Sequence, residues 1–279
     1  MYAVCANREA NNHPLPTNTQ IMPEKDILDD ILGRVASGTL SPIDAAGQLK
    51  FAPFRQMLDG VTVDTHRQIR TGAPETVFAR GKSVERLISA VAALSGDDGA
   101  SPVLASRVSP EQGEALQKAF PDGTYWAEAA TFSRNRAMPH SPPWPSSGEV
   151  MVVTAGTSDM PVALEALATL HFHGVSAGLA ADIGVAGLHR VTPWLPVFEK
   201  ASVLIVVAGM EGALPSVMAG LTGKPVVAVP TSVGYGVALG GFAALAGMLS
   251  SCSPGIAVVN IDNGYGAAMF AARLMRVKQ

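Results

Sequence analysis

Four short stretches combine glycine with small polar or acidic residues, and each lies at the end of an apolar run. They are AGTSD (155–159), AGMEG (208–212), TSVGYG (231–236) and IDNGYG (261–266). Glycine lets backbone N–H groups approach an anion closely, and a helix that begins after such a loop favours negative charge. One loop of this kind is common turn chemistry, whereas four at one edge of a sheet favour a phosphate-binding site.

Charged residues gather near the same loops. Four of the six acidic residues after Val150 lie at expected strand ends: Asp159, Asp182, Glu211 and Asp262. Isolated carboxylates in a charge-poor region are candidates for a functional role, with solvation or helix capping as the alternative for each. His189 and Arg190 add basic groups able to contact phosphate or carboxylate. Neither GxGxxG nor a Walker sequence is present, so the loops match no standard dinucleotide fingerprint or P-loop.

The two cysteines, Cys5 and Cys252, form neither a disulfide framework nor a CxxC metal site. Cys252 lies in GMLSSCSPG (247–255), before the last apolar run. Two interpretations are open for it: a nucleophile, or a small buried side chain of the kind that free cysteines commonly provide.

The second half of the chain alternates apolar runs with helical patterns, which predicts a parallel sheet covered on both faces. The expected strands are 150–156, 175–181, 203–209, 225–232 and 256–262, and the expected helices are 158–172, 211–221, 238–251 and 265–277. Ligands of such sheets bind beyond the carboxyl ends of the strands, where the four glycine loops lie.

The first half predicts a smaller α/β unit, and the fold class is therefore α/β throughout. Its expected strands are 75–79, 102–108 and 124–132, with helices at 83–94 and 109–120. We expect a disordered tail (1–22), an N-terminal α/β domain (23–133), a Pro/Ser-rich linker (134–149) and a doubly wound three-layer αβα catalytic domain with a mostly parallel sheet (150–279).

Composition narrows the classes of partner. A net charge of −3 gives no reason to expect nucleic acid or an anionic membrane. Residues 225–261 contain no ionisable Asp, Glu, Lys, Arg or His, but prolines and glycines interrupt them, so we expect buried strands and a buried helix rather than a membrane span. The first residues lack the apolar core of a signal peptide, and a cytoplasmic location is expected.

Longer motifs carry a family resemblance. AGTSDMPVALEA, ADIGVAGLHR, VVAGMEGALPSV, VPTSVGYG, MLSSC and VVNIDNGYGAA resemble the LarB family, whose C-terminal domain is similar to phosphoribosyl-aminoimidazole carboxylase. VDTHRQIRTGAPETVFARGKS (63–83) resembles that family's N-terminal motif, so the resemblance spans roughly residues 55–277. Leu164 departs from it, because an acid is expected there. The resemblance implies an enzyme that carboxylates and hydrolyses nicotinic acid adenine dinucleotide in nickel-pincer cofactor biosynthesis, for lactate racemase.

That substrate explains a need for a thiol. A nicotinate pyridinium is too electron-poor to attack CO2, whereas a thiolate added at ring C4 leaves an enamine whose C5 is nucleophilic. C5 then takes up CO2 and loses its proton, the thiolate departs, and a 3,5-dicarboxylate results. Hydrolysis of the phosphoanhydride releases AMP, with Mg2+ expected to bridge the phosphates and CO2 or bicarbonate as co-substrate.

The resemblance and the loops together assign roles. Cys252 is the expected nucleophile and Glu211 the candidate for proton handling, while the metal ligands stay unassigned. The expected substrate-binding residues are Gly156, Thr157, Ser158, Asp159, Asp182, His189, Arg190, Gly209, Ser232, Gly234, Tyr235, Gly236, Ser251, Asp262, Asn263 and Gly264, with Arg67, Arg70, Glu75 and Lys82 from the first domain.

Distance predicts a shared site. Cys252 precedes the last strand whereas the phosphate loops follow strands, and a strand of seven residues separates those edges by roughly 23 Å. We therefore expect a homo-oligomer, an octamer being one candidate, whose subunits share each site.

Two other functions are weighed. One is a phosphoribosyl-aminoimidazole carboxylase or mutase of purine biosynthesis, which is disfavoured because Ala213-Leu-Pro-Ser216 replaces that enzyme's HLPG segment. The other is a non-catalytic dinucleotide sensor, which would need the loops but not the thiol.

Overall fold

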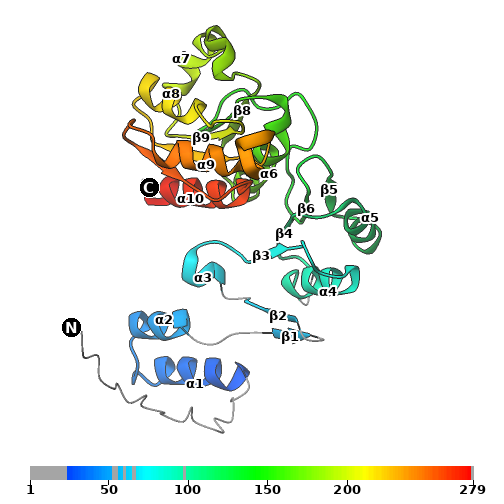
Figure 1. Cartoon of the computed structure of the whole chain (residues 1–279). Helices are drawn as coiled ribbons and strands as arrows, with labels where there is room; N and C mark the ends of the chain where they lie inside the picture. Colours follow the sequence, from blue (N-terminus) through cyan, green and yellow to red (C-terminus); the bar gives the residue numbers. More distant parts are fainter. Residues whose placement is uncertain (1–23, 52–55, 59–60, 65–66, 97–98, 278–279) are drawn as a thin grey trace, which may run out of the picture. The chain divides into compact units, whose positions relative to one another are not determined.

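The computed structural model describes residues 24–51, 56–58, 61–64, 67–96 and 99–277 (Figure 1). The chain divides into two compact units, residues 1–54 and 55–279. The first unit contains helices α1 (Glu24–Ala36) and α2 (Pro42–Phe51), and Ile31 and Ala45 are buried in it. The disordered tail predicted for residues 1–22 lies outside the described residues.

The second unit begins with small sheets and three helices. Strands β1 (Gln56–Leu58) and β2 (Val61–Val63) form an antiparallel pair, and a four-stranded mixed sheet has the order β3-β4-β6-β5. Its members are β3 (Thr76–Phe78), β4 (Val103–Ser106), β5 (Thr124–Trp126) and β6 (Thr131–Arg134), with helices α3 (Arg67–Thr71), α4 (Val84–Leu94) and α5 (Pro110–Ala119). Strands β3 and β4 are parallel, so both carboxyl ends lie at one edge.

The sequence prediction for this region is right for the helices and wrong for one strand. Ser83 caps α4, and Ser109 with Gln112 forms a capping box at α5, which explains why both helices begin where expected. The predicted single strand 124–132 is two antiparallel strands, β5 and β6. Ala130 takes a left-handed conformation (φ 48°) in the turn between them. Alanine rarely adopts this conformation, so the sequence did not predict a turn here.

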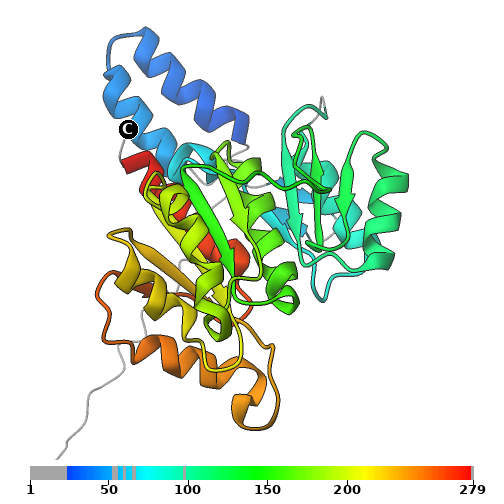
Figure 2. The ribbon, with the colours of Figure 1, turned by 90° about the horizontal axis from the view of Figure 1, so that it is seen from above.

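The larger sheet is entirely parallel, in the order β11-β10-β9-β7-β8 (Figure 2). Its strands are β7 (Val150–Thr154), β8 (Ala177–Ala180), β9 (Val203–Ala208), β10 (Val226–Pro230) and β11 (Ile256–Val258). The helices are α6 (Met160–Phe172), α7 (Leu195–Phe198), α8 (Leu214–Leu221), α9 (Phe242–Leu249) and α10 (Gly264–Val277). This is the expected doubly wound αβα domain, and its strand order reverses between β7 and β9.

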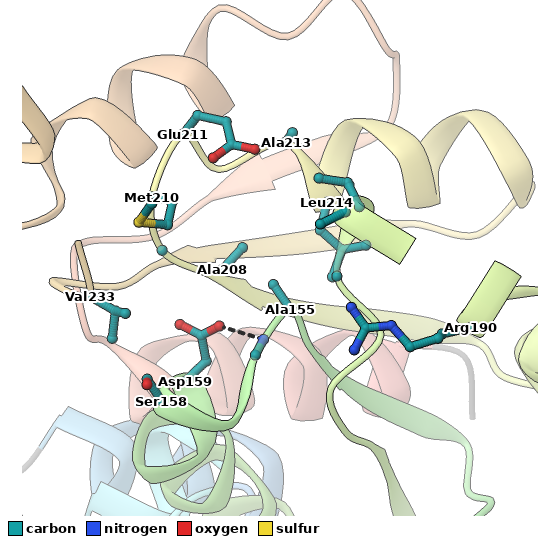
Figure 3. Close-up of a pocket in the computed structure, with 15 residues that line it drawn as sticks. Ala155, Ser158, Asp159, Arg190, Ala208, Met210, Glu211, Ala213, Leu214 and Val233 are labelled. Carbon is teal, nitrogen blue, oxygen red and sulfur yellow. Dashed lines mark hydrogen bonds between the residues drawn. The ribbon is translucent and has the colours of Figure 1, made fainter. Parts of the chain in front are cut away.

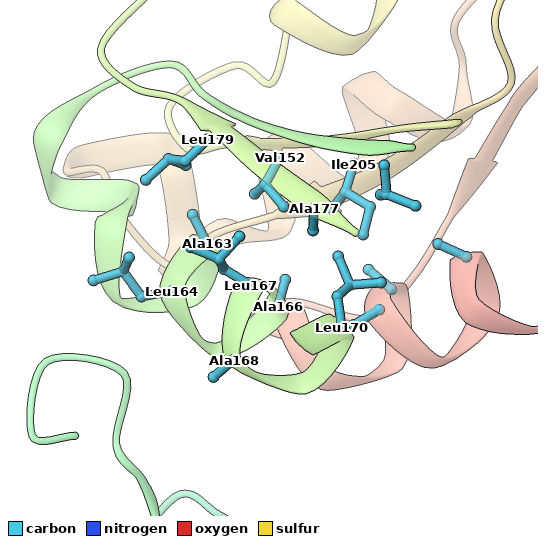
Figure 4. Close-up of a cluster of buried hydrophobic side chains, with 14 of the residues drawn as sticks. Val152, Ala163, Leu164, Ala166, Leu167, Ala168, Leu170, Ala177, Leu179 and Ile205 are labelled. Atoms are coloured by element: carbon cyan, nitrogen blue, oxygen red, sulfur yellow. The ribbon is translucent and has the colours of Figure 1, made fainter. Parts of the chain in front are cut away.

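Side chains along each strand alternate between the two faces of this sheet, so that a hydrophobic core forms on each face. Val152 and Ile205 face Leu167 and Leu170 of α6, as Figure 4 shows, in a cluster that also includes residues of α10. Their neighbours along the strands, such as Met151 and Leu204, belong to the opposite cluster with α7, α8 and α9. Because both faces are covered, every residue of β7, β9 and β10 is buried.

One predicted helix is divided, and its surroundings are not all buried. Residues 238–251 were expected to form one buried helix, but a 3₁₀ segment, η4 (Gly236–Gly241), precedes α9. Leu239 and Gly240 adopt left-handed conformations there, which breaks the helix. Val237, Leu239 and Phe242 are exposed by 87%, 72% and 59%. The expectation of deep burial is therefore wrong for this segment.

The segment that connects β6 to β7 contacts both the four-stranded and the five-stranded sheet. Residues 135–149 contain neither helix nor strand, yet Trp144 stacks on Trp126 with ring centroids 5.1 Å apart. The Pro145 carbonyl accepts a hydrogen bond from the Leu179 amide at 2.7 Å. Across the described part of the chain, every helix is too short or too polar to span a bilayer.

Candidate active site

A pocket of about 320 Å³ opens at the carboxyl edge of the large sheet, where the strand order reverses (Figure 3). This switch point is where parallel α/β sheets bind ligands. The lining residues are Ala155, Gly156, Ser158 and Asp159 after β7, Gly184, Val185, Ala186 and Arg190 after β8, Ala208, Gly209, Met210, Glu211, Ala213 and Leu214 after β9, and Val233 after β10.

Asp159 holds three of the pocket loops together. Its side chain is buried, and its Oδ2 accepts a hydrogen bond from the Gly156 amide at 2.9 Å while Oδ1 accepts from Thr231 Oγ1 at 2.7 Å. Burial raises the pKa of this carboxyl, and hydrogen bonds from Thr231 and from the amides of Gly156 and Gly209 oppose the rise. A buried carboxyl with a raised pKa at the mouth of a pocket is typical of a functional site.

Close backbone approach requires glycine at two positions of the pocket. A Cβ at Gly209 would lie 2.4 Å from the Val233 carbonyl oxygen, and a Cβ at Gly184 would lie 2.5 Å from the Ala155 carbonyl oxygen. The loops after β9 and β10 touch here, because the Met210 amide donates to the Val233 carbonyl at 2.8 Å. These contacts leave no room for side chains between neighbouring loops.

Two further acids differ in their surroundings. Arg190 lines the pocket and forms an ion pair with Asp182 at 3.0 Å, with both side chains partly exposed. Such an exposed pair contributes little stability, so Arg190 stays available to an anion. Glu211 is exposed and lines the pocket, whereas His189 is exposed and is absent from the pocket lining.

The loops after β10 and β11 contact one another beside the pocket. The Ser232 amide donates to Asp262 Oδ1 at 2.8 Å, and Asn263 Oδ1 accepts from the Gly266 amide at 2.8 Å at the start of α10. Asp262 and Asn263 line a second cavity rather than the first. Ser232, Gly234, Tyr235, Gly236, Thr157, Ser251 and Gly264 line neither cavity.

Cys252 is a free, exposed thiol, which excludes the alternative of a buried packing residue. Its neighbours are anchored: Ser251 Oγ lies 2.7 Å from Ser216 Oγ, and Ser253 Oγ donates to the Ser216 carbonyl at 3.1 Å. Ser216 is the third residue of α8, whose first residue, Leu214, lines the pocket.

The strand-length separation expected between Cys252 and the loops stays a prediction. The helix that precedes Cys252, α9, lies against the loop after β9. A Cβ at Gly247 would meet the Glu211 carbonyl oxygen at 2.5 Å, and a Cβ at Gly212 would meet the Ala244 carbonyl oxygen at 2.8 Å. The chain returns to β11 only after Cys252. The thiol still stands outside the pocket lining.

The four residues expected from the first domain line neither cavity. Glu75 accepts a hydrogen bond from the Asp64 amide, and Lys82 Nζ donates to the Phe78 carbonyl at 2.8 Å. Arg67 lies in α3 with Arg70, whose side chain falls outside the described residues. Sequence reasoning missed Arg80 and Arg107, which do line the second cavity. Their signal was their position just after the parallel strands β3 and β4.

The fold is an α/β fold with a pocket at its switch point, and the family models indicate an enzyme of the carboxylase type. A family model described as AIR carboxylase matches residues 149–279, which contain the whole parallel sheet and the pocket. A model described as LarB/PurE-like N-terminal domain matches residues 55–136, which contain the mixed sheet.

Full-length similarity gives the family. The uncharacterized Methanocaldococcus jannaschii protein MJ0165 is 38% identical over 265 residues, which cover 90% of this chain and 97% of that protein. The N5-carboxyaminoimidazole ribonucleotide mutases of Methanocaldococcus jannaschii and Pyrococcus horikoshii are 35% and 32% identical over 136 and 137 residues. Those matches cover 46% of this chain, and 80% and 73% of the mutases. The chain belongs to the LarB family.

Proposed function

We propose that the protein carboxylates nicotinic acid adenine dinucleotide at C5 of its pyridinium ring, through an adduct with Cys252, and then hydrolyses the phosphoanhydride to release AMP. The observation that carries the proposal is an exposed free thiol whose neighbours are bound to the first turn of α8, beside a pocket at the switch point. Family membership supports a carboxylase-type reaction.

The proposed carboxylation balances without an oxidant or reductant. The Cys252 thiolate forms a bond to ring C4, and the displaced electron pair makes C5 nucleophilic. C5 then bonds to the carbon of CO2 and gives up its proton, after which the C4–S bond breaks and aromaticity returns. The net change replaces one ring hydrogen by a carboxylate and releases one proton.

The carboxyl groups of Asp159 and Glu211 line the pocket. We assign to Glu211 the role of accepting the proton from C5. Glu211 is exposed at the pocket, whereas both oxygens of Asp159 already accept hydrogen bonds from Gly156 and Thr231. Asp159 is then the residue that fixes the loops. Arg190 provides positive charge for the substrate's carboxylate or phosphate.

Mg2+ is proposed for the hydrolysis step. No group of three or more His, Cys, Asp or Glu residues forms a metal cluster among the described residues. Mg2+ needs no such cluster, because it commonly binds one or two carboxylates together with substrate phosphates. Asp262 fits that use, since its charge is close enough to Asp159 to raise the pKa of Asp159. A bound Mg2+ would polarise the phosphoanhydride and neutralise charge on the leaving AMP.

Mass spectrometry after incubation with the dinucleotide, bicarbonate and Mg2+ tests the reaction. We expect a mononucleotide product carrying one additional carboxylate, together with AMP. Cys252→Ser should bind the dinucleotide normally and lose carboxylation, whereas Ser250→Ala, an exposed change two residues away, should retain it. Carboxylation at the wild-type rate by Cys252→Ser would refute the adduct.

A homo-oligomer with shared sites is also proposed. Exposed apolar side chains lie on η4, on the residue before it and on α9, the segment that precedes Cys252: Tyr235, Val237, Leu239, Phe242 and Leu249. Several exposed large apolar side chains on one segment favour a protein partner, and a second copy of the chain is the partner proposed here. Mixing Cys252→Ala with Glu211→Gln protein should restore part of the activity. Absence of recovery after verified subunit exchange would refute sharing.

The aminoimidazole ribonucleotide mutase reaction is the second candidate, since mutases share 35% and 32% identity with the carboxylase-like part. It predicts turnover of N5-carboxyaminoimidazole ribonucleotide that is unaffected by Cys252→Ser. A cytoplasmic location stays a prediction.

A further inference from the structure

A second cavity, of about 360 Å³, is lined by residues that follow strands of the four-stranded sheet and of the five-stranded sheet. Phe78 and Arg80 reach it from the end of β3, and Ser106 and Arg107 from the end of β4. Asp262 and Tyr265 reach it from the loop after β11 and the start of α10. The carboxyl ends of parallel strands from both sheets therefore converge on one cavity.

The charges in this cavity are unequally compensated. Arg107 donates to Glu165 from Nε at 2.8 Å and from Nη2 at 3.1 Å, and also to the Asp262 carbonyl. Arg80, by contrast, is exposed and has no hydrogen bond or ion pair with any residue that the structure describes. An uncompensated guanidinium at the wall of a cavity is suited to a phosphate.

An aromatic residue, Phe78, lines the same cavity as Arg80. Phe78 is 53% exposed at the end of β3, and it lines the cavity together with Tyr265. Large apolar side chains are mostly buried, so an exposed ring facing a polar cavity is informative. Aromatic side chains stack on nucleobases, and Arg80 is only two residues from Phe78.

The two cavities are connected through two adjacent residues. Thr231 donates to Asp159, which lines the first cavity, and the Ser232 amide donates to Asp262, which lines the second. Each cavity is near the lower end of the range of about 300–1,000 Å³ for small-molecule sites, so each suits a mononucleotide. Two such sites side by side match a ligand made of two nucleotide halves.

We propose that this second cavity binds the nucleoside 5′-phosphate half of the dinucleotide that does not react, with its base on Phe78 and its phosphate on Arg80. Arg107 is a positioning residue that holds the Asp262 loop through its hydrogen bond to the Asp262 carbonyl. The assignment rests on the proposed function, which supplies the dinucleotide, and it places the reacting pyridinium in the first cavity.

Calorimetric titration of the full chain with AMP and, separately, with nicotinic acid mononucleotide tests the subsite. Arg80→Gln should weaken AMP binding about tenfold to a hundredfold, the usual worth of a charge-assisted hydrogen bond. Phe78→Leu keeps an apolar side chain and removes the stacking ring, so it should weaken AMP binding about tenfold. Neither change should alter binding of the pyridine mononucleotide more than twofold. The matched control is Arg86→Gln, an exposed arginine of α4 outside both cavities.

Each outcome decides between the subsite and the function. Wild-type protein that does not bind millimolar AMP, or Arg80→Gln protein that binds AMP normally, overturns the subsite even where carboxylation of the dinucleotide stands. Equal weakening of both mononucleotides overturns the division of the substrate between the cavities. AMP binding that depends on Arg80 and Phe78, in a protein without carboxylation, keeps the subsite and refutes the proposed function.

Discussion

Replacing Glu165 should destabilise the second unit more than any exposed charge change. The Glu165 side chain is 3% exposed and accepts hydrogen bonds from Arg107 Nε and Nη2 and from the Tyr265 amide at 3.2 Å. Glu165→Gln keeps the shape but leaves one acceptor oxygen for three donors. Burial raises the pKa of Glu165 and the charge of Arg107 lowers it, so the carboxylate depends on its partner.

The magnitude follows from the burial of the two partners. Breaking a buried ion pair costs about 3–5 kcal/mol. Arg107 is 27% exposed and keeps some contact with water, so we take about 2–3 kcal/mol. For a domain of this size each kcal/mol lowers the Tm by about 2–4 °C, which gives a decrease of about 4–12 °C.

Urea denaturation at pH 7, with thermal unfolding in parallel, measures the change. Glu128→Gln, at an exposed position, is the control and should stay within about 0.5 kcal/mol of wild type. Arg107→Met combined with Glu165→Met should be less destabilised than the sum of the two single variants, because no buried charge is left unpaired. Strict additivity, or an unchanged Glu165→Gln variant, would refute the reasoning.

Three other expectations concern the anchor of the thiol, the core and pH. Ser216→Ala should lower the carboxylation kcat several-fold and leave dinucleotide affinity unchanged, since only the anchoring of Cys252 is lost; a rate equal to wild type would contradict that role. Leu170→Ala, at a fully buried site, should cost about 2–5 kcal/mol in urea denaturation. Burial, reinforced by neighbouring arginines, lowers the pKa of His173 to about 4. Between pH 8 and pH 5, His173 therefore takes up a proton in the unfolded chain but stays neutral in the folded protein. The free energy of unfolding should fall by about 2 kcal/mol over this range. The His173→Gln variant should lack this decrease.

Most strands and helices were predictable from local sequence signals. Continuous apolar runs indicate the buried strands, and capping residues indicate where helices begin. Ser109 and Gln112 mark the start of α5, and the runs after Val150 mark β7 to β11. The turn at Ala130 was not predictable, since an alanine with positive φ is stabilised by its surroundings rather than by its own preference. The same holds for Leu239, which divides the expected helix.

The candidate site was predictable only as a set of loops. All four glycine loops do follow parallel strands of one sheet. However, the pattern of apolar runs does not determine the order of the strands in the sheet. That order places the loops at Asp159 and Glu211 around the first cavity and the loop at Asp262 at the second. The direction of α9, which decides where Cys252 lies, depends on the contacts of Gly212 and Gly247 and has no local signal.

The contact of Glu165 with Arg107 makes the carboxylase-like half dependent on the half that precedes it. A fragment of residues 149–279 would retain the acid in α6 and lose its cation, Arg107, which directly follows β4. The backbone amides of Gly264 and Tyr265 at the start of α10 would remain beside that charge. We therefore expect Glu165→Gln to stabilise a separated fragment of residues 149–279, although the same change destabilises the full chain.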